Sequence, residues 1–399
     1  MTPADRHDVD RRVAPLRPTG TVELESEDAL AAHLDAHGSL AGCVLKGLEL
    51  EAERWVDALA TVDLAGAAFL GCHLARSTLD QAQADGALVF PPISGLPFDP
   101  YRGDVYTPAE LYDAFASGPA SAPQYADCLD AQVDSWFLAN RPPDVLAALF
   151  QRLHDHAITD ALAERVTGRD VVAVMGGHDA RRGDPAFAAA ASLGRDLARR
   201  GLLVATGGGP GAMEAVNLGA FLSGAPDDEL RAALMTLAAA PDYADRDAWV
   251  GAAWSVRRAA ADAGVVPVES VGVPTWFYGH EPPNAFAECC AKYFENSVRE
   301  DGLLALGTAG VIFTPGSAGT VQEVFQDATA NHYATTGAPR PMVFLGVEAW
   351  TQALPVVPLL RRLAEGHAYA DRILVTDDAA AAVQFVVDWL PSTAGGAGP

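Results

Sequence analysis

Residues 170–215 read DVVAVMGGHDARRGDPAFAAAASLGRDLARRGLLVATGGGPGAMEA, and this stretch decides the fold. Residues 170–175 form a continuous run rich in valine, as in strands that are buried on both faces of a parallel sheet. A second run of this kind spans 202–206. Between the two runs, apolar residues recur at helical spacing, which predicts a helix over 184–200 with the inward-facing residues Phe187, Ala191, Leu193 and Leu197. Two strands joined by a helix form the βαβ unit of a parallel sheet.

The same alternation of strands and helices continues to the end of the chain. We expect further strands at 265–273, 310–314, 341–345 and 373–376, and helices at about 284–300, 319–331, 348–364 and 378–390. An insertion at about 224–262 has helical spacing and is expected to pack beside the sheet. This repetition predicts an α/β fold with a doubly wound parallel sheet of the Rossmann-like kind.

The chain before this alternation has a different character. The segment 62–90 places Leu, Ala or Phe roughly every five residues, which loosely resembles a pentapeptide-type β-solenoid. Two or three such coils could not bury a core alone, so we expect a small accessory α+β domain there. The predicted organisation is a flexible arm at 1–20, the accessory domain at 21–125, a helical linker at 126–167, the nucleotide-binding domain at 168–390 and a disordered tail at 391–399. Within the linker, the apolar residues at helical spacing are Val145, Leu146, Leu149, Phe150 and Leu153.

Charge and cysteine content limit the classes of function. The 399 residues include 27 Lys and Arg against 52 Asp and Glu, a formal charge of −25 that repels nucleic acid and anionic membranes. Alternatively, the acidic residues could simply form a well-solvated surface and carry no information about partners. The five cysteines are odd in number and form no Cys-x-x-Cys pair, which argues against a disulfide framework and a thiolate zinc site. The N-terminus has no apolar signal segment and no apolar run could span a bilayer, so a cytoplasmic protein is expected.

The first glycine-rich loop stands where the second strand ends and a helix begins. It reads Thr206-Gly-Gly-Gly-Pro-Gly-Ala-Met-Glu214. Glycines let the backbone approach a phosphate, and the free amides of a helix N-terminus point at it. The loop also fits the relaxed dinucleotide pattern G-x-G-x-x-A, but no acidic residue ends a following strand as a ribose-binding carboxylate would. A tight turn without a ligand is the alternative.

The second loop reads Thr314-Pro-Gly-Ser-Ala-Gly-Thr-Val-Gln-Glu323, and it too joins a buried strand to a helix. Neither loop contains the lysine of a Walker A motif, which makes an ATPase or kinase a poor interpretation. A phosphate here would be held by amides, hydroxyls and the helix dipole. Glu323 lies one helical turn beyond the loop, close to any ribose attached to that phosphate, although it could also be a favourable acid in a first helical turn. Two such loops at adjacent strand ends predict one crevice.

With these motifs the sequence resembles the LOG (LONELY GUY) family, formerly mislabelled as lysine decarboxylases, over about 169–390. The resemblance rests on residues 175–201, on GGGPGAMEA at 207–215, on a helix with Arg299, and on PGSAGTVQE at 315–323, where the family has PGGxGTxxE. It is most similar to the longer bacterial nucleotide 5′-monophosphate nucleosidases, such as AMP nucleosidases. Ser317 departs from the family's second glycine, and Glu300 follows Arg299 where the family often has Arg-Lys.

The resemblance implies a hydrolase, a phosphoribohydrolase that splits a nucleoside 5′-monophosphate into free base and ribose 5-phosphate. The implied catalytic residues are Glu323 and Arg299. It implies no cofactor and no metal, and an assembly of at least two copies. The implied substrate- and phosphate-binding residues are Gly176, Gly177, Gly207, Gly208, Gly209, Gly211, Met213, Glu214, Gly316, Ser317, Ala318, Gly319 and Thr320.

Several assignments stay open from the residues alone. The departing base needs a proton or hydrogen-bond donor, for which His178 and His280 are candidates and structural roles are the alternative. The aromatic segment 275–294 could stack on a base, or Trp276, Phe277 and Tyr293 could belong to the core or to a subunit interface. A non-catalytic nucleotide-binding or sensing protein is the alternative to an enzyme. An NAD-dependent oxidoreductase would need a ribose-binding acid and a hydride acceptor site, and the sequence shows neither. Lysine decarboxylation would need a Schiff-base lysine, but Lys46 and Lys292 are the only lysines and neither lies in a recognisable cofactor motif.

Overall fold

The computed structural model describes residues 21–117, 123–279, 281–335 and 337–390. The chain forms two compact units, Met1–Gly103 and Asp104–Pro399. The first unit therefore ends earlier than the expected boundary at 125, and the segment expected as a linker belongs to the second unit. The expected arm 1–20 and tail 391–399 lie outside the described residues.

The second unit contains a seven-stranded sheet in which every pair of neighbouring strands is parallel. Its order is β10-β9-β8-β7-β11-β12-β13. The direction of winding reverses between β7 and β11, so the loops after these strands meet at the topological switch point of a doubly wound sheet. The strands are β7 (Val171–Met175), β8 (Leu203–Thr206), β9 (Val271–Gly272), β10 (Cys289–Cys290), β11 (Gly310–Phe313), β12 (Met342–Leu345) and β13 (Ile373–Thr376). The α/β fold expected from the sequence is confirmed.

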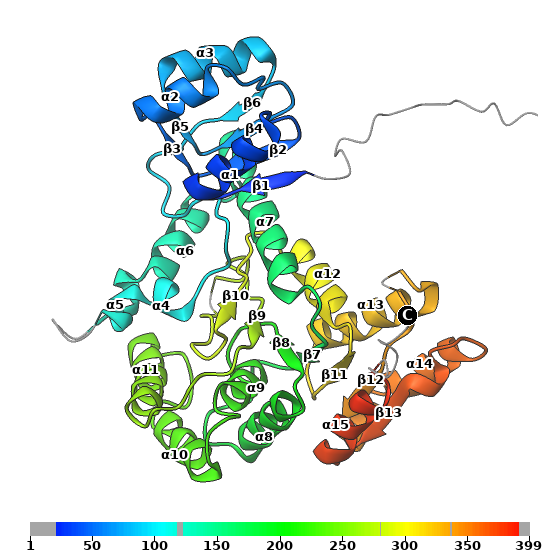
Figure 1. The fold of residues 1–399 in the computed structure, drawn as a ribbon. Helices are drawn as coiled ribbons and strands as arrows, with labels where there is room; N and C mark the ends of the chain where they lie inside the picture. The colour runs from blue at the N-terminus through cyan, green and yellow to red at the C-terminus, as the bar shows by residue number, and fades with distance from the viewer. Residues whose placement is uncertain (1–20, 118–122, 280, 336, 391–399) are drawn as a thin grey trace, which may run out of the picture. The chain divides into compact units, whose positions relative to one another are not determined.

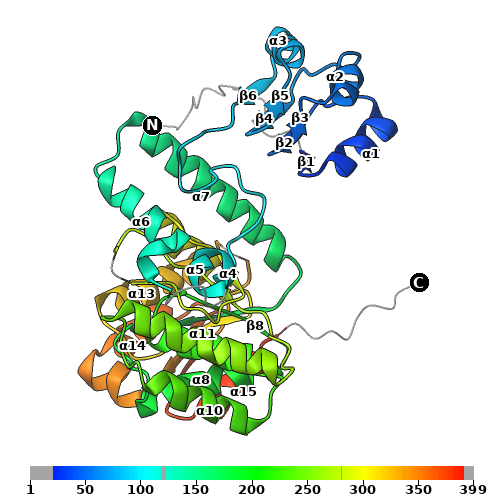
Figure 2. The same ribbon diagram turned by 90° about the vertical axis from the view of Figure 1, so that its left-hand side faces the viewer.

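Helices cover both faces of this sheet (Figure 1). On one face, α8 (Pro185–Arg199) packs against α9 (Ala212–Phe221) and α15 (Ala379–Asp388). On the other face, α13 (Ala318–Tyr333) packs against α12 (Asn296–Leu306) and α14 (Val356–Ala364), which follows the π-helical turn η2 (Ala349–Ala353). The expected helical insertion forms α10 (Asp227–Ala238) and α11 (Arg246–Asp262), which lie side by side (Figures 1 and 2). The four inward residues expected on α8 are all buried.

Two sequence expectations for the second unit were wrong in detail. No helix begins at 284: strand β10 occupies part of that segment, and α12 begins only at Asn296. Local helix formers such as Ala and Glu favoured a helix there, but almost every side chain from Pro282 to Phe294 is buried, which a helix with one inward face cannot achieve. The strand expected at 265–273 is only Val271–Gly272. Cys289 and Cys290 therefore lie on a strand, and burial raises the pKa of the Cys289 thiol to about 12.

The segment 104–167 is mainly helical, with α4 (Pro108–Leu111), α5 (Asp113–Ala116), η1 (Tyr125–Asp127), α6 (Leu129–Ala139) and the long α7 (Val145–Val166). The apolar residues used to predict α7 do not form its buried face: Val145, Leu146 and Leu149 are exposed. The buried residues of α7 are instead Ala147, Gln151, His154, Asp155, Ala157, Ile158, Ala161 and Leu162, of which two form polar contacts with neighbouring segments. His154 Nε2 lies 2.8 Å from the Tyr106 hydroxyl, and Asp155 accepts hydrogen bonds from the amides of Phe294 and Glu295. No helix in the described part of the chain has both the length and the apolar surface needed to cross a membrane.

The first unit is built from parallel strands separated by short helices, rather than the α+β arrangement expected. Four strands pair in the order β1-β2-β4-β6, and β3 pairs with β5. The paired residues Val44 and Ala68, like Glu49 and His73, are 24 residues apart in the sequence, so one coil of the chain there spans 24 residues. The elements are β1 (Val22–Leu24), α1 (Glu27–His37), β2 (Cys43–Lys46), β3 (Glu49–Leu50), α2 (Glu53–Leu59), β4 (Ala68–Leu70), β5 (His73–Leu74), α3 (Arg76–Asp85) and β6 (Leu88–Phe90).

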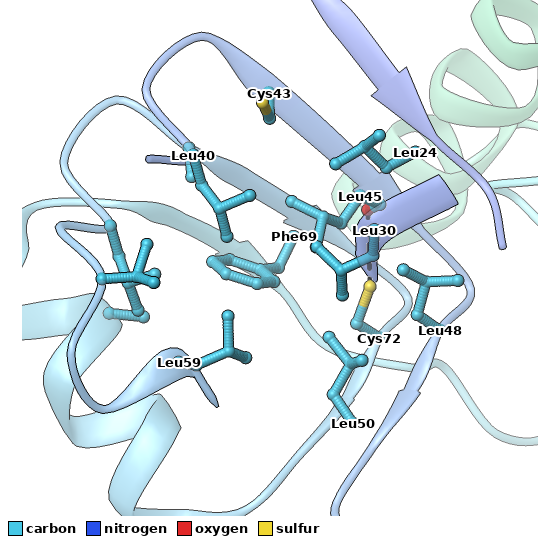
Figure 3. Close-up of a cluster of buried hydrophobic side chains, with 14 of the residues drawn as sticks. Leu24, Leu30, Leu40, Cys43, Leu45, Leu48, Leu50, Leu59, Phe69 and Cys72 are labelled. Carbon is cyan, nitrogen blue, oxygen red and sulfur yellow. Dashed lines mark hydrogen bonds between the residues drawn. The ribbon is translucent and has the colours of Figure 1, made fainter. Parts of the chain in front are cut away.

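This first unit has a hydrophobic core of its own. Figure 3 shows Phe69 among leucine side chains of neighbouring coils, including Leu30, Leu45 and Leu59. All four of these side chains are fully buried. Strands and helices both contribute apolar residues to this core, which the strands β1, β2, β3 and β4 and the helices α1, α2 and α3 enclose together.

Glycine permits the close contact between α8 and α9, and this contact is testable. A Cβ atom on Gly219 would lie 1.8 Å from the carbonyl oxygen of Ala191, a backbone atom that cannot rotate away. We expect Gly219→Ala to lower the free energy of unfolding by about 2 kcal/mol, measured by urea denaturation, because the two helices must separate. The matched control is Gly302→Ala in α12, where nothing lies within 4 Å, and alanine there should be neutral or stabilising. Equal stability of the two variants would contradict this account of the contact.

Candidate active site

A cleft of about 300 Å³ lies at the C-terminal ends of β7, β8 and β11. This is the edge of a parallel sheet where backbone amides of following helices are available to ligands. Both glycine-rich loops contribute to the cleft. Its lining residues are Gly176, Gly177, His178, Gly207, Gly209, Met213, Pro274, Thr275, Tyr278, Glu281, Arg299, Glu300, Ser317, Gly319, Thr320 and Glu323.

The first glycine-rich loop turns tightly because side chains have no room there. Gly208 has a φ of +71°, and a Cβ atom on it would lie 2.7 Å from Cδ of Pro274. Gly207 faces the cleft, where a Cβ atom would lie 2.7 Å from Sδ of Met213 and 3.4 Å from Nη1 of Arg299. The absence of side chains thus brings the guanidinium of Arg299 against the backbone of the loop.

A buried polar network supports this loop from behind, and sequence reasoning missed it. The Thr206 hydroxyl donates to Oδ1 of Asn217 (2.6 Å) and accepts from the amide of Gly208 (3.0 Å). Nδ2 of Asn284 donates to the same Asn217 oxygen (3.0 Å) and to the carbonyl of Gly209 (3.2 Å). Asn217 and Asn284 are both buried. No local motif marks them, because their partners lie on three separate segments of the chain.

The second glycine-rich loop is locked to the loop after β7. A Cβ atom on Gly176 would lie 2.0 Å from the hydroxyl oxygen of Thr314, and the amide of Gly177 donates to the carbonyl of Pro315 (3.4 Å). Gly316 is covered by Thr320, whose hydroxyl oxygen would lie 2.1 Å from an added Cβ atom. Ser317 has a φ of −109°, a conformation open to any L residue, so a serine is tolerated where a glycine was expected.

The chemical groups of the cleft are provided by α12 and α13. Arg299 is nearly buried; its Nε donates to Oδ1 of Asn296 (2.9 Å) and its Nη2 to Oε1 of Glu300 (3.2 Å). Burial raises the pKa of the Glu323 carboxyl to about 7, with Arg299 lowering it and Glu300 raising it. A carboxyl with this pKa exchanges its proton near neutral pH and can serve as a general base.

Not every predicted site residue lines the cleft. Glu214 is fully buried and forms an ion pair with Arg182, whose Nε lies 2.9 Å from Oε2 of Glu214. It therefore holds the loop after β7 to α9 and does not face a ligand. Gly208 and Gly211 shape the first loop through positive φ angles, while Gly316 and Ala318 support the second. The predicted residues that do line the cleft are Gly176, Gly177, Gly207, Gly209, Met213, Arg299, Ser317, Gly319, Thr320 and Glu323.

Two further groups of the cleft were only partly foreseen. His178 lines it, and its Nδ1 lies 3.2 Å from Oε1 of Glu281. The aromatic side chain in the cleft is Tyr278. Trp276 and Tyr293, which were candidates for stacking on a base, are buried in the core. His280 lies outside the described residues.

A second cavity, of about 530 Å³, lies at the same edge of the sheet and shares Gly177 and Ser317 with the cleft. Its lining is mostly apolar and comes from α8, from the loops after β7, β11, β12 and β13, and from the first residues of α9 and α15. No candidate acid, base or cation among the predicted residues faces it. The cleft with Arg299 and Glu323 is therefore the candidate active site.

Fold and cleft together define an α/β protein with a doubly wound parallel sheet and a polar site at the C-terminal ends of its strands. No family model and no curated protein matches the chain. Among solved structures, it is similar to a molybdenum cofactor binding protein from Rippkaea orientalis, with 16% identity and a TM-score of 0.35 over 56% of this chain and 99% of that one. It is also similar to the molybdenum cofactor carrier protein from Chlamydomonas reinhardtii in two structures, with 18% and 19% identity and TM-scores of 0.33 and 0.32, over 56% of this chain and 98% and 99% of theirs. These likenesses provide no argument about a ligand.

Proposed function

We propose that the protein hydrolyses the N-glycosidic bond of nucleoside 5′-monophosphates, giving a free base and ribose 5-phosphate. One observation supports this proposal above the others. Two glycine-rich loops, a nearly buried arginine and a carboxyl with a pKa of about 7 line a single cleft. The resemblance of the sequence motifs to the LOG family points to the same reaction.

The phosphate would bind where α13 begins. The first amides of a helix have no partner within the helix and carry a partial positive charge. Ser317 and Thr320 add hydroxyl groups, and Gly319 has open space at its Cα. Because Arg299 is already paired with Glu300, the amides and hydroxyls would provide much of the attraction for the phosphate.

The sugar would then lie beside Glu323, one turn further along α13. Cleavage of the bond between C1′ and the base nitrogen develops positive charge on the ribose, as in glycoside hydrolysis. An ionised Glu323 would stabilise that charge and accept a proton from the water whose oxygen bonds to C1′. The electron pair of the broken bond leaves with the base, which takes up one proton.

The direct test is to incubate the purified protein with purine and pyrimidine nucleoside 5′-monophosphates and to detect free base by chromatography. We expect base release from at least one monophosphate and much slower release from the matching nucleoside, which lacks the phosphate. Equal rates for nucleotide and nucleoside would contradict the role given to the loops. Binding of a monophosphate without release would favour a non-catalytic nucleotide-binding protein.

The pH dependence of the reaction follows from Glu323. The ionised carboxylate is the active form, and burial raises the pKa of Glu323 to about 7. We therefore expect kcat/KM to fall about tenfold for each pH unit below about pH 7, and to level off above it. Steady-state rates between pH 5 and pH 9 would measure this profile. A flat profile across pH 7 would contradict a basic role for Glu323.

A further inference from the structure

The carboxylate of Glu300, which lines the cleft, accepts hydrogen bonds from three side chains. Its Oε1 accepts from Nδ2 of Asn296 (2.7 Å) and from Nη2 of Arg299 (3.2 Å). Its Oε2 accepts from Nε2 of Gln322 (2.9 Å), which lies on α13 next to Glu323. The Glu300 side chain is only 11% exposed, and its contacts with Asn296 and Arg299 are partly buried, whereas Gln322 is exposed. The carboxylate is therefore held in one orientation by donors from two helices.

We infer that Glu300 is a positioning residue of this cleft: its carboxylate ties Arg299 on α12 to Gln322 on α13 and sets a fixed negative charge beside Glu323. The inference rests on the proposed function, because Arg299 and Glu323 are the groups it would position. Sequence motifs gave no role to Glu300, since its position follows Arg299 where the family often has lysine.

The first consequence concerns the direction of the Arg299 guanidinium. Asn296 holds Nε and Glu300 holds Nη2, so Nη1 is directed toward the backbone of Gly207. A guanidinium is planar and rigid, so fixing two of its nitrogens also fixes the third. Glu300 thereby points Arg299 across the cleft, toward the space between the two glycine-rich loops.

The second consequence concerns the proton of Glu323. Two nearby carboxylates repel each other when both are ionised, which favours the protonated form of the less well hydrogen-bonded one. The pKa of Glu323 is raised first by burial, is lowered by Arg299 and is raised further by Glu300. The other titratable groups that line the cleft are His178, Tyr278 and Glu281. Glu300 therefore helps to set the pH at which Glu323 becomes a base.

The experiment compares Glu300→Gln with Asp301→Asn in the full chain. Asp301 is the next residue of α12, and it accepts a hydrogen bond from Gln326 of α13 outside the cleft, so its variant removes a similar charge between the same two helices and keeps an acceptor oxygen, as Glu300→Gln does. Carbon-13 NMR of glutamate-labelled protein gives the titration of Glu323, whose resonance is assigned by its absence in Glu323→Gln. We expect the pKa of Glu323 to fall by about one unit in Glu300→Gln and to stay in place in Asp301→Asn. An unchanged titration in Glu300→Gln would overturn the inference.

Activity provides a second readout. We expect the acid limb of kcat/KM to move to lower pH by the same amount in Glu300→Gln, while Glu300→Ala, which leaves Nη2 of Arg299 without its acceptor, lowers the plateau by about tenfold or more. A plateau in Glu300→Ala equal to that of Asp301→Asn would contradict the positioning of Arg299. Absence of base release by the wild-type protein would refute the proposed function alone, because the titration of Glu323 needs no substrate.

Discussion

Glu323→Gln is expected to lower the rate of base release by about 10³-fold, because the amide can neither accept the proton of water nor carry a compensating negative charge. The substitution keeps the size of the side chain. The amides of α13, Ser317 and Thr320 remain in place, so binding of a nucleoside 5′-monophosphate should change little. Single-turnover rates measure the chemical step, and calorimetry measures the affinity.

The control for this experiment is Glu348→Gln, which removes one exposed carboxylate outside the cleft. We expect it to retain the wild-type rate. If Glu323→Gln released base as fast as the control, Glu323 would have no catalytic role. If affinity fell together with rate, Glu323 would contribute to binding the substrate and not mainly to the reaction.

Glu214→Gln is expected to lower the free energy of unfolding by about 3–5 kcal/mol, because it leaves the charge of Arg182 buried without an ionised partner. The side chains of Arg182 and Glu214 are almost completely buried. Arg182 also donates to the carbonyl of Trp249 (2.8 Å) and stacks on the Trp249 ring at 4.2 Å. The ion pair thus connects α9, the loop before α8 and the insertion helix α11. Tryptophan fluorescence during urea denaturation would measure the loss.

The neighbouring arginine provides the matched control. Arg181 forms an ion pair with Asp242 at 2.6 Å, but the two side chains are 57% and 44% exposed. Asp242→Asn should therefore cost less than about 1 kcal/mol. A loss in Glu214→Gln no larger than in Asp242→Asn would show that burial of the first pair has no special effect. Glu214 was predicted to bind substrate, but the structure places it in the protein interior. A large loss of stability in Glu214→Gln would support a structural role for this residue.

The βαβ unit could be predicted from the sequence because its evidence is local. Residues 171–175 are continuously apolar, and α8 repeats apolar residues at 3.6-residue spacing, so each element shows its burial in its own composition. The glycine-rich loops were equally visible, since a backbone that approaches other groups closely needs glycine at fixed places. Strand β10 was not predictable in this way. Its two cysteines lie in a segment of residues that favour helices. The segment is buried on every side in the folded protein, and this burial, which the local sequence does not show, favours an extended strand over a helix with one inward face.

The sequence by itself determined the α/β class and the two glycine-rich loops, because each depends on composition and short-range spacing. Arg299 and Glu323 became candidate catalytic residues through the resemblance of their motifs to the LOG family. Tertiary structure decided which of these residues share a cleft. It turned Glu214 toward Arg182, gave Glu300 three donors from two helices, and placed Asn217 and Asn284 behind the first loop. These roles depend on contacts between segments far apart in the chain, and the packing of the sheet and its helices brings those segments together.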